Sequence, residues 1–142
     1  MTGAIFGAFP EGGVELKNHE DILRNEEIER LVKIGTRIGI KRVRLTGGEP
    51  LVRKGLTDII RRLSGIPGIF DLSMTTNGIL LKDQAERLAQ AGFKRVNVSL
   101  DTLKPEIYRR LTRWGNLSDV LSGIEAASKA GLSPIKIEER KP

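Results

Sequence analysis

Apolar residues recur along the chain in two rhythms that alternate with each other. Stretches with apolar residues three and four positions apart predict helices over residues 25–38, 56–63, 82–91, 105–111 and 117–130. Shorter stretches, in which apolar and polar residues alternate, predict strands that begin near Lys41, Ile69, Lys94 and Pro134. Helices and strands that alternate in this way are typical of βα units, which build a parallel sheet with right-handed crossovers.

Each predicted strand has one apolar face and one polar face. In the stretch after Ile69, Leu72 and Met74 alternate with Ser73 and Thr75. A sheet with helices on both faces would be apolar throughout, whereas the strands of a barrel turn one face inward. We therefore expect an α/β fold, a partial (half) TIM-like βα barrel with about four parallel strands and helices on one face. A complete barrel needs about 250 residues, and this chain has 142.

The pattern divides the chain into three parts. They are an irregular N-terminal arm over residues 1–24, the partial barrel over residues 25–138 and a short tail over residues 139–142. The glycine-rich start of the arm could instead form a frayed first strand. Half a barrel has two unpaired edges and an uncovered polar face. We therefore expect self-association, or another chain, to cover them.

The composition of the chain limits the compartment and the kinds of binding partner that we expect. The chain has no cysteine, so it forms no disulfide or thiolate metal site, and a cytoplasmic location is the default. No apolar run approaches the roughly 20 residues that span a bilayer, and the first ten residues lack the basic start of a signal peptide. The net charge of +6 favours anionic partners such as phosphates. The basic residues are dispersed and aromatic residues make up only 4%, which argues against nucleic acid as a partner.

Polar side chains gather near the carboxyl ends of the predicted strands. Those that alternation places on the polar face are Arg44, Thr46, Thr75, Ser99 and Lys136. Arg44 and Lys136 suit an anion such as a phosphate, and the hydroxyl groups of Thr75 and Ser99 suit a sugar or a carboxylate. No acid–base pair, nucleophile–histidine pair or metal cluster emerges. Residue types alone thus predict ligand binding, with no catalytic and no metal-binding residue.

The stretch RLTGGEP, residues 44–50, ends the first of these strands. Gly47 and Gly48 allow the backbone to approach a ligand closely and to present N–H groups. The Glu49 carboxylate suits an ammonium group or a ribose hydroxyl. Alternatively, it holds the local turn.

Together with TTNG at residues 75–78 and NVSLDT at residues 97–102, this stretch resembles the radical S-adenosylmethionine (SAM) superfamily. Within it, the chain resembles the MoaA family of GTP 3',8-cyclases, which act in the first step of molybdenum cofactor biosynthesis. The resemblance covers about four-fifths of the chain. It implies an open barrel of βα units. It also implies that Gly47, Gly48, Glu49 and Ser99 bind SAM, and that Arg44, Thr75 and Lys136 bind GTP.

The same resemblance implies a [4Fe–4S] cluster on three cysteines spaced CxxxCxxC. Those positions fall on Met1, Ile5 and Ala8, which cannot bind iron. The family's first strand would precede Met1, and its last units would follow Pro142. We therefore expect a truncated chain that holds no cluster and is inactive by itself. Two alternatives stay open. One is a non-catalytic half-barrel interaction module that dimerises. The other is a domain that binds a phosphate ligand through Arg44, Lys136 and Glu49.

Overall fold

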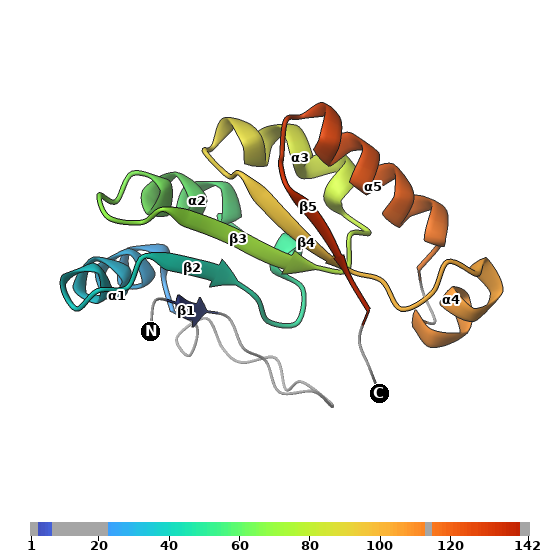
Figure 1. Cartoon of the computed structure of the whole chain (residues 1–142), viewed down its shortest axis with the longest axis horizontal. Coiled ribbons are helices and arrows are strands. Elements are labelled where there is room, and N and C mark those ends of the chain that lie inside the picture. Colours follow the sequence, from blue (N-terminus) through green and yellow to red (C-terminus); the bar gives the residue numbers. More distant parts are fainter. Residues whose placement is uncertain (1–2, 7–22, 113–114, 140–142) are drawn as a thin grey trace.

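The computed structural model of the chain describes residues 3–6, 23–112 and 115–139. In this part of the chain, five strands form one parallel sheet in the order of the sequence. They are β1 (Gly3–Phe6), β2 (Arg42–Leu45), β3 (Asp71–Thr76), β4 (Arg95–Ser99) and β5 (Ile135–Glu138). Figure 1 shows β1 and β5 at the two edges of the sheet. Neighbouring parallel strands in sequence order are the arrangement of a βα barrel, which confirms the predicted partial barrel.

Helices occupy the connections between the strands. They are α1 (Asn25–Arg37), the 3-10 helix η2 (Pro50–Val52), α2 (Leu56–Ser64), α3 (Leu81–Gln90), α4 (Pro105–Thr112) and α5 (Leu117–Lys129). The five α-helices begin and end within one residue of their predicted bounds. Gly39, Gly92 and Gly131 follow three of them with positive φ angles, the left-handed conformation that ends many helices. No helix in the described part of the chain is long and apolar enough to cross a membrane.

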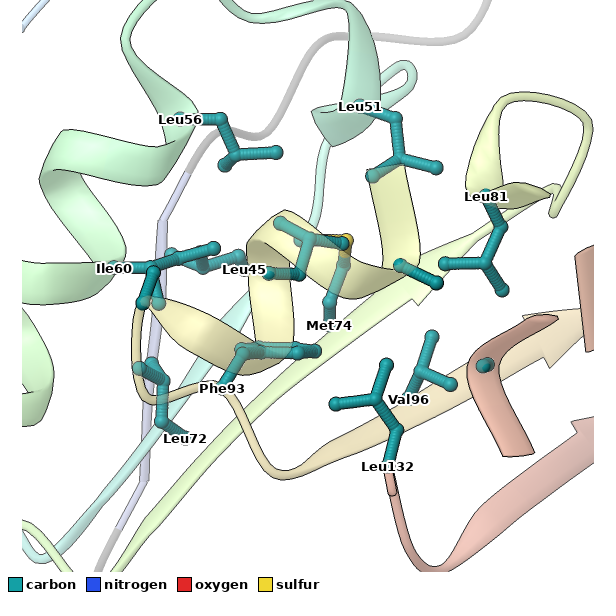
Figure 2. Close-up of a cluster of buried hydrophobic side chains, with 14 of the residues drawn as sticks. Leu45, Leu51, Leu56, Ile60, Leu72, Met74, Leu81, Phe93, Val96 and Leu132 are labelled. Carbon is teal, nitrogen blue, oxygen red and sulfur yellow. The ribbon is translucent and has the colours of Figure 1, made fainter. Parts of the chain in front are cut away.

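One core joins the helices to one face of the sheet. The strands contribute Val43, Met74, Val96 and Val98, each at most 1% exposed. Helices α1, α2, α3 and α5 contribute buried residues to the same cluster, among them Val32, Ile59, Leu63, Leu81, Leu88 and Val120. Figure 2 shows Met74 among Leu45, Phe93 and Val96, with Leu51 of η2 and Leu81 of α3 pointing toward the same cluster. The described helices therefore cover the apolar face, as predicted, and we call the opposite, polar face the open face.

The structure differs from the sequence prediction at the N-terminus. Gly3–Phe6 forms β1 beside β2, the frayed first strand that the sequence left open as the alternative to an irregular arm over residues 1–24, and the sheet has five strands where about four were predicted. A strand of this chain therefore occupies the edge beside β2, whereas the family resemblance placed the first strand before Met1. Four residues are too short an alternation to separate a strand from a loop. Residues 7–22 of the predicted arm and residues 140–142 of the tail lie outside the described residues.

Helix α1 also differs in detail. Its buried residues are Ile28, Val32 and Gly35, whereas Leu31 is 45% exposed and Ile38, just after the helix, is 78% exposed. The apolar stripe is therefore wider than the surface that α2 and the sheet cover. Arg24 is the N-cap residue of α1, and Asn25 is the first residue of the helix. The Asn25 side chain donates to the Gly55 carbonyl and thereby ties α1 to the start of α2.

Candidate functional site

Rows of polar side chains cross the open face of the sheet, because residues in register on parallel strands point the same way. From the amino end of the strands to the carboxyl end, the rows are Arg44–Ser73–Arg95, Thr75–Asn97–Lys136 and Ser99–Glu138. Successive rows lie about 6.6 Å apart, since a parallel strand rises about 3.3 Å per residue. The structure therefore brings Thr75 and Lys136 into one row. Arg44 lies one row before them and Ser99 one row after.

Positive charge prevails on this face. The Arg95 guanidinium lies 2.9 Å from the Asp71 carboxylate, and the Lys136 ammonium lies 3.5 Å from Glu138 on the same strand. Arg44 forms no ion pair within the described part of the chain. A half-buried guanidinium that no carboxylate of the described residues neutralises is suited to bind an anion, because its N–H groups form charge-assisted hydrogen bonds. The Lys136 side chain is 67% exposed, so it too is accessible to a ligand.

The Glu49 carboxylate joins the loops that follow β2 and β3. Its Oε1 atom accepts hydrogen bonds from the Leu51 backbone N–H at 3.1 Å and from the Thr76 hydroxyl at 2.6 Å. Its Oε2 atom accepts from the Asn77 backbone N–H at 2.8 Å. Glu49 therefore does hold a turn, the alternative that the sequence left open, and it also connects that turn to the neighbouring strand. We call Glu49, Thr76 and Asn77 the carboxylate clamp.

Both loops of the clamp are held by local hydrogen bonds. In the first loop Glu49 is the N-cap of η2, and Pro50 follows at a position where its missing N–H costs nothing. In the second, the Asn77 side chain accepts from the Ile79 N–H at 3.0 Å, and Gly78 has φ +81°. The Gln84 side chain of α3 donates to the Leu51 carbonyl at 2.9 Å and so anchors η2 to α3.

Within the described part of the chain, one acceptor site of the Glu49 carboxylate has no donor. A carboxylate offers about four lone-pair sites, two on each oxygen. The described residues fill both sites on Oε1 and one on Oε2. The remaining site suits a positively charged donor such as an α-amino group. Gly47 and Gly48, which precede Glu49, carry no side chains, and Gly48 is exposed.

The residues do not fit an iron–sulfur cluster. The sequence contains no cysteine, and iron–sulfur clusters are held by thiolates. Of the positions that correspond to the cluster cysteines, Ile5 lies in β1, whereas Met1 and Ala8 lie outside the described residues. Within the described ranges, no three histidine, aspartate or glutamate side chains gather as metal ligands.

Sequence reasoning missed Thr76, Asn97 and Ser73. Alternation assigned Thr76 to the helix-covered face, where it is indeed 1% exposed, but its hydroxyl group reaches back to Glu49. Ser73 and Asn97 lie on the open face and are nonetheless buried. Ser73 lies between Arg44 and Arg95 in its row, and Asn97 lies between Thr75 and Lys136. The two consecutive threonines of TTNG, residues 75–78, were the feature of the sequence that could have indicated a role for Thr76.

A groove elsewhere on the surface is not formed by the predicted site residues. It lies between α4 and α5 and has a volume of about 730 Å³. Its lining includes Pro105, Arg109, Asn116 and Leu121. The polar rows and the carboxylate clamp are therefore the candidate site, and this groove is separate from the residues that form them.

Comparisons with known proteins identify the family of this chain. A family model described as the radical SAM superfamily matches residues 6–138. Proteins named GTP 3',8-cyclase from Pelotomaculum thermopropionicum and Moorella thermoacetica are each 56% identical to the chain over 128 residues. The one from Alkaliphilus metalliredigens is 52% identical. These alignments cover 90% of the chain but only 39–40% of each relative, so the chain spans about two-fifths of their length.

Two solved structures share the fold. Native anSMEcpe with bound AdoMet superposes with a TM-score of 0.65 at 20% identity, over 96% of this chain and 43% of the other. Coproporphyrinogen III oxidase (HemN) from Escherichia coli, described as a radical SAM enzyme, superposes with a TM-score of 0.52 at 17% identity. That match covers 82% of this chain and 31% of the other. At these identities the likeness concerns the fold alone.

Proposed function

Because this chain belongs to the radical SAM superfamily, we propose that it is a ligand-binding segment of a GTP 3',8-cyclase of molybdenum cofactor biosynthesis. The support is its similarity to proteins of that name over 90% of its length. Since the chain spans about two-fifths of those relatives, the proposal concerns the binding and orientation of SAM and GTP. No residue of the chain can hold the [4Fe–4S] cluster that the resemblance implies, so we assign no radical step to it.

In this proposal the methionine end of SAM lies against Gly47, Gly48, Glu49 and Ser99. The observation that carries it is the Glu49 carboxylate, held by three donors from two loops and left with one acceptor site on Oε2. That site receives the α-amino group of SAM. Exposed Gly48 lets the ligand approach the backbone, and Ser99 ends β4 with a hydroxyl on the same open face.

GTP lies nearer the amino ends of the strands, against the rows Arg44–Ser73–Arg95 and Thr75–Asn97–Lys136. Arg44 and Lys136 face its phosphates, because both are accessible cations on neighbouring rows. Thr75 shares its row with Lys136 and offers a hydroxyl group to the sugar or the base. The net positive charge of the rows strengthens this placement, since it attracts an anionic ligand before contact.

Calorimetric titration of the 142-residue chain with SAM and, separately, with GTP tests both placements. Glu49→Ala is expected to weaken SAM binding about tenfold or more, since it removes a charge-assisted hydrogen bond, and to leave GTP binding nearly unchanged. Arg44→Ala is expected to do the reverse. Lys129→Ala, an exposed lysine on α5, is the matched control and should change neither affinity. Equal effects of Glu49→Ala and Arg44→Ala on both ligands would contradict the placement.

Anaerobic reconstitution with iron and sulfide tests the assignment of no radical step. We expect no iron–sulfur absorption band and no cleavage of SAM by this chain alone. A cluster band together with SAM cleavage would overturn that assignment.

One observation favours a second candidate, a half-barrel module that associates with its own copies. Within the described residues β5 pairs only with β4, and Ile137 is 54% exposed although its register partner Val98 is buried. An open strand edge of this kind can pair with another chain. Sedimentation velocity at micromolar concentration should then show a dimer that Ile137→Lys weakens. A strict monomer would exclude the module.

The rows also suit a simpler phosphate ligand, bound through Arg44 and Lys136 with Glu49 on its hydroxyl groups. The same titrations decide between the candidates. Binding of a sugar phosphate without binding of SAM or GTP would favour this third function, and binding of none would favour the module.

A further inference from the structure

The hydroxyl group of Thr76 has one orientation available to it. Its oxygen accepts a hydrogen bond from the Gly78 backbone N–H at 3.1 Å. A hydroxyl carries a single proton. That proton points to the Glu49 Oε1 atom, 2.6 Å away, a distance typical of a charge-assisted O–H···O⁻ bond. Thr76 is 1% exposed, so water has little access to take its place.

The carboxylate of Glu49 needs such a donor to hold its plane. The last torsion of a glutamate side chain is broad and nearly two-fold, so the chain itself does not fix the carboxylate. Three hydrogen bonds do so here. Thr76 and Leu51 fix Oε1, and Asn77 fixes Oε2. Thr76 supplies the shortest of the three and the only one from a side chain.

From these contacts we propose that Thr76 is a positioning residue. Its hydroxyl group holds the Glu49 carboxylate so that the remaining acceptor site on Oε2 faces the α-amino group of the bound ligand. The inference rests on the proposed binding of SAM beside Glu49. It adds a residue of the helix-covered face to the machinery that recognises the amino group of that ligand class.

The test measures how much affinity the amino group contributes. SAM and its desamino analogue, in which hydrogen replaces the α-amino group, are titrated into the wild type and into Thr76→Val. This substitution keeps the shape of the side chain and removes the hydroxyl group. We expect about tenfold weaker binding of SAM, the effect of one misdirected charge-assisted hydrogen bond. The affinity for the desamino analogue should stay within about twofold, because that ligand does not use Glu49.

Two further variants separate positioning from general support of the fold. Thr76→Ser retains the hydroxyl group and should restore SAM binding to within about threefold of the wild type, since the same hydrogen bond can form. Thr36→Val is the matched control. It also removes a threonine hydroxyl, one that donates to the Lys33 carbonyl at 2.7 Å on α1, and it should leave both affinities unchanged. If Thr76→Val does not fold, Thr76→Ala is expected to show the same selective loss.

Each outcome has a distinct meaning. Equal loss for SAM and the desamino analogue would overturn the role of Thr76, as would an unchanged affinity for SAM or a failure of Thr76→Ser to restore it. In those cases the proposed SAM site would stand. A wild-type chain that binds neither ligand would overturn the proposed function, and the role of Thr76 with it.

Discussion

The two faces of the sheet in this protein differ in what they contribute. On the face covered by helices, Met74 is fully buried in a continuous apolar core. The next residue of β3, Thr75, faces the open side, in a row with Asn97 and Lys136. Consecutive residues of one strand thus serve different purposes, since strand side chains alternate between faces. Stability and the proposed ligand chemistry are thus separated by the thickness of a single sheet.

The carboxylate clamp is where the two faces connect. Thr76 belongs to the covered face, yet its hydroxyl group contacts Glu49, which lies in the loop after β2. Gly123 of α5 packs against the TTNG turn so closely that a Cβ atom added there would lie 2.6 Å from the Gly78 carbonyl oxygen. A change in the core near this point is therefore expected to alter the candidate site.

The largest effect is expected from Met74→Ala. Removal of this buried side chain should lower the free energy of unfolding by about 2–5 kcal/mol, the usual cost of lost burial plus the cavity that remains. Chemical denaturation measures it. The neighbouring Thr75→Val, which keeps the branched shape on the open face, should change the free energy of unfolding by no more than about 0.5 kcal/mol. Similar losses for both variants would show that the two faces do not differ in this way.

A smaller effect is expected from Gly123→Ala. A Cβ atom at this position would lie 2.6 Å from the Gly78 carbonyl oxygen and 3.0 Å from Leu81 Cβ, so α5 or the TTNG turn has to move. We expect a loss of about 1–3 kcal/mol in the free energy of unfolding. Because the turn carries the Asn77 N–H of the clamp, SAM binding should weaken as well.

Gly65→Ala is the control for this substitution. Gly65 has φ −84°, and the atom nearest to an added Cβ would lie at an ordinary 3.5 Å. Its effect on the free energy of unfolding should stay within about 0.5 kcal/mol. Weaker SAM binding in Gly65→Ala, or normal binding in a destabilised Gly123→Ala, would separate the turn from the site.

The smallest effect is expected outside both faces, at the ion pairs between α1 and α2. Arg62 lies 2.8 Å from both Glu29 and Asp58. The pKa of Glu29 is lowered by its hydrogen bond with Arg62 and, to a smaller extent, by its hydrogen bond with Lys33. The pKa of Asp58 is lowered by its hydrogen bond with Asn25 and, to a smaller extent, by its hydrogen bond with Arg62. Carboxyl groups with lowered pKa stabilise the fold above their unfolded pKa, near 4, and lose that contribution as the pH falls below it.

The pH dependence of unfolding tests this group. Stability should decrease between about pH 5 and pH 3, and the decrease should be shallower in Arg62→Met, which retains the aliphatic part of the side chain. High salt should reduce the difference, since these side chains are accessible to solvent. Lys129→Met, which removes a separate ion pair on α5, should keep the wild-type pH profile. An identical profile in Arg62→Met would show that Arg62 does not set it.

The sequence by itself determined the order of the elements and the two faces of the sheet. The bounds of the α-helices followed from apolar spacing, and the faces of Met74 and Thr75 followed from strand alternation. Both are local periodicities that any stretch of chain carries by itself. The motif around Gly47, Gly48 and Glu49 also indicated the superfamily, because its residues stand together in the sequence.

Only the tertiary structure decided which side chains meet. Leu31 matches the helical stripe but is exposed, because the stripe is wider than the surface that covers it. The strand at Gly3–Phe6 follows from its pairing with β2, and not from a pattern of its own. Glu49 and Thr76 are 27 residues apart, and alternation placed Thr76 on the face away from the site. Their hydrogen bond depends on the register of β2 and β3 and on the path of the loop above them, and no local periodicity contains that information.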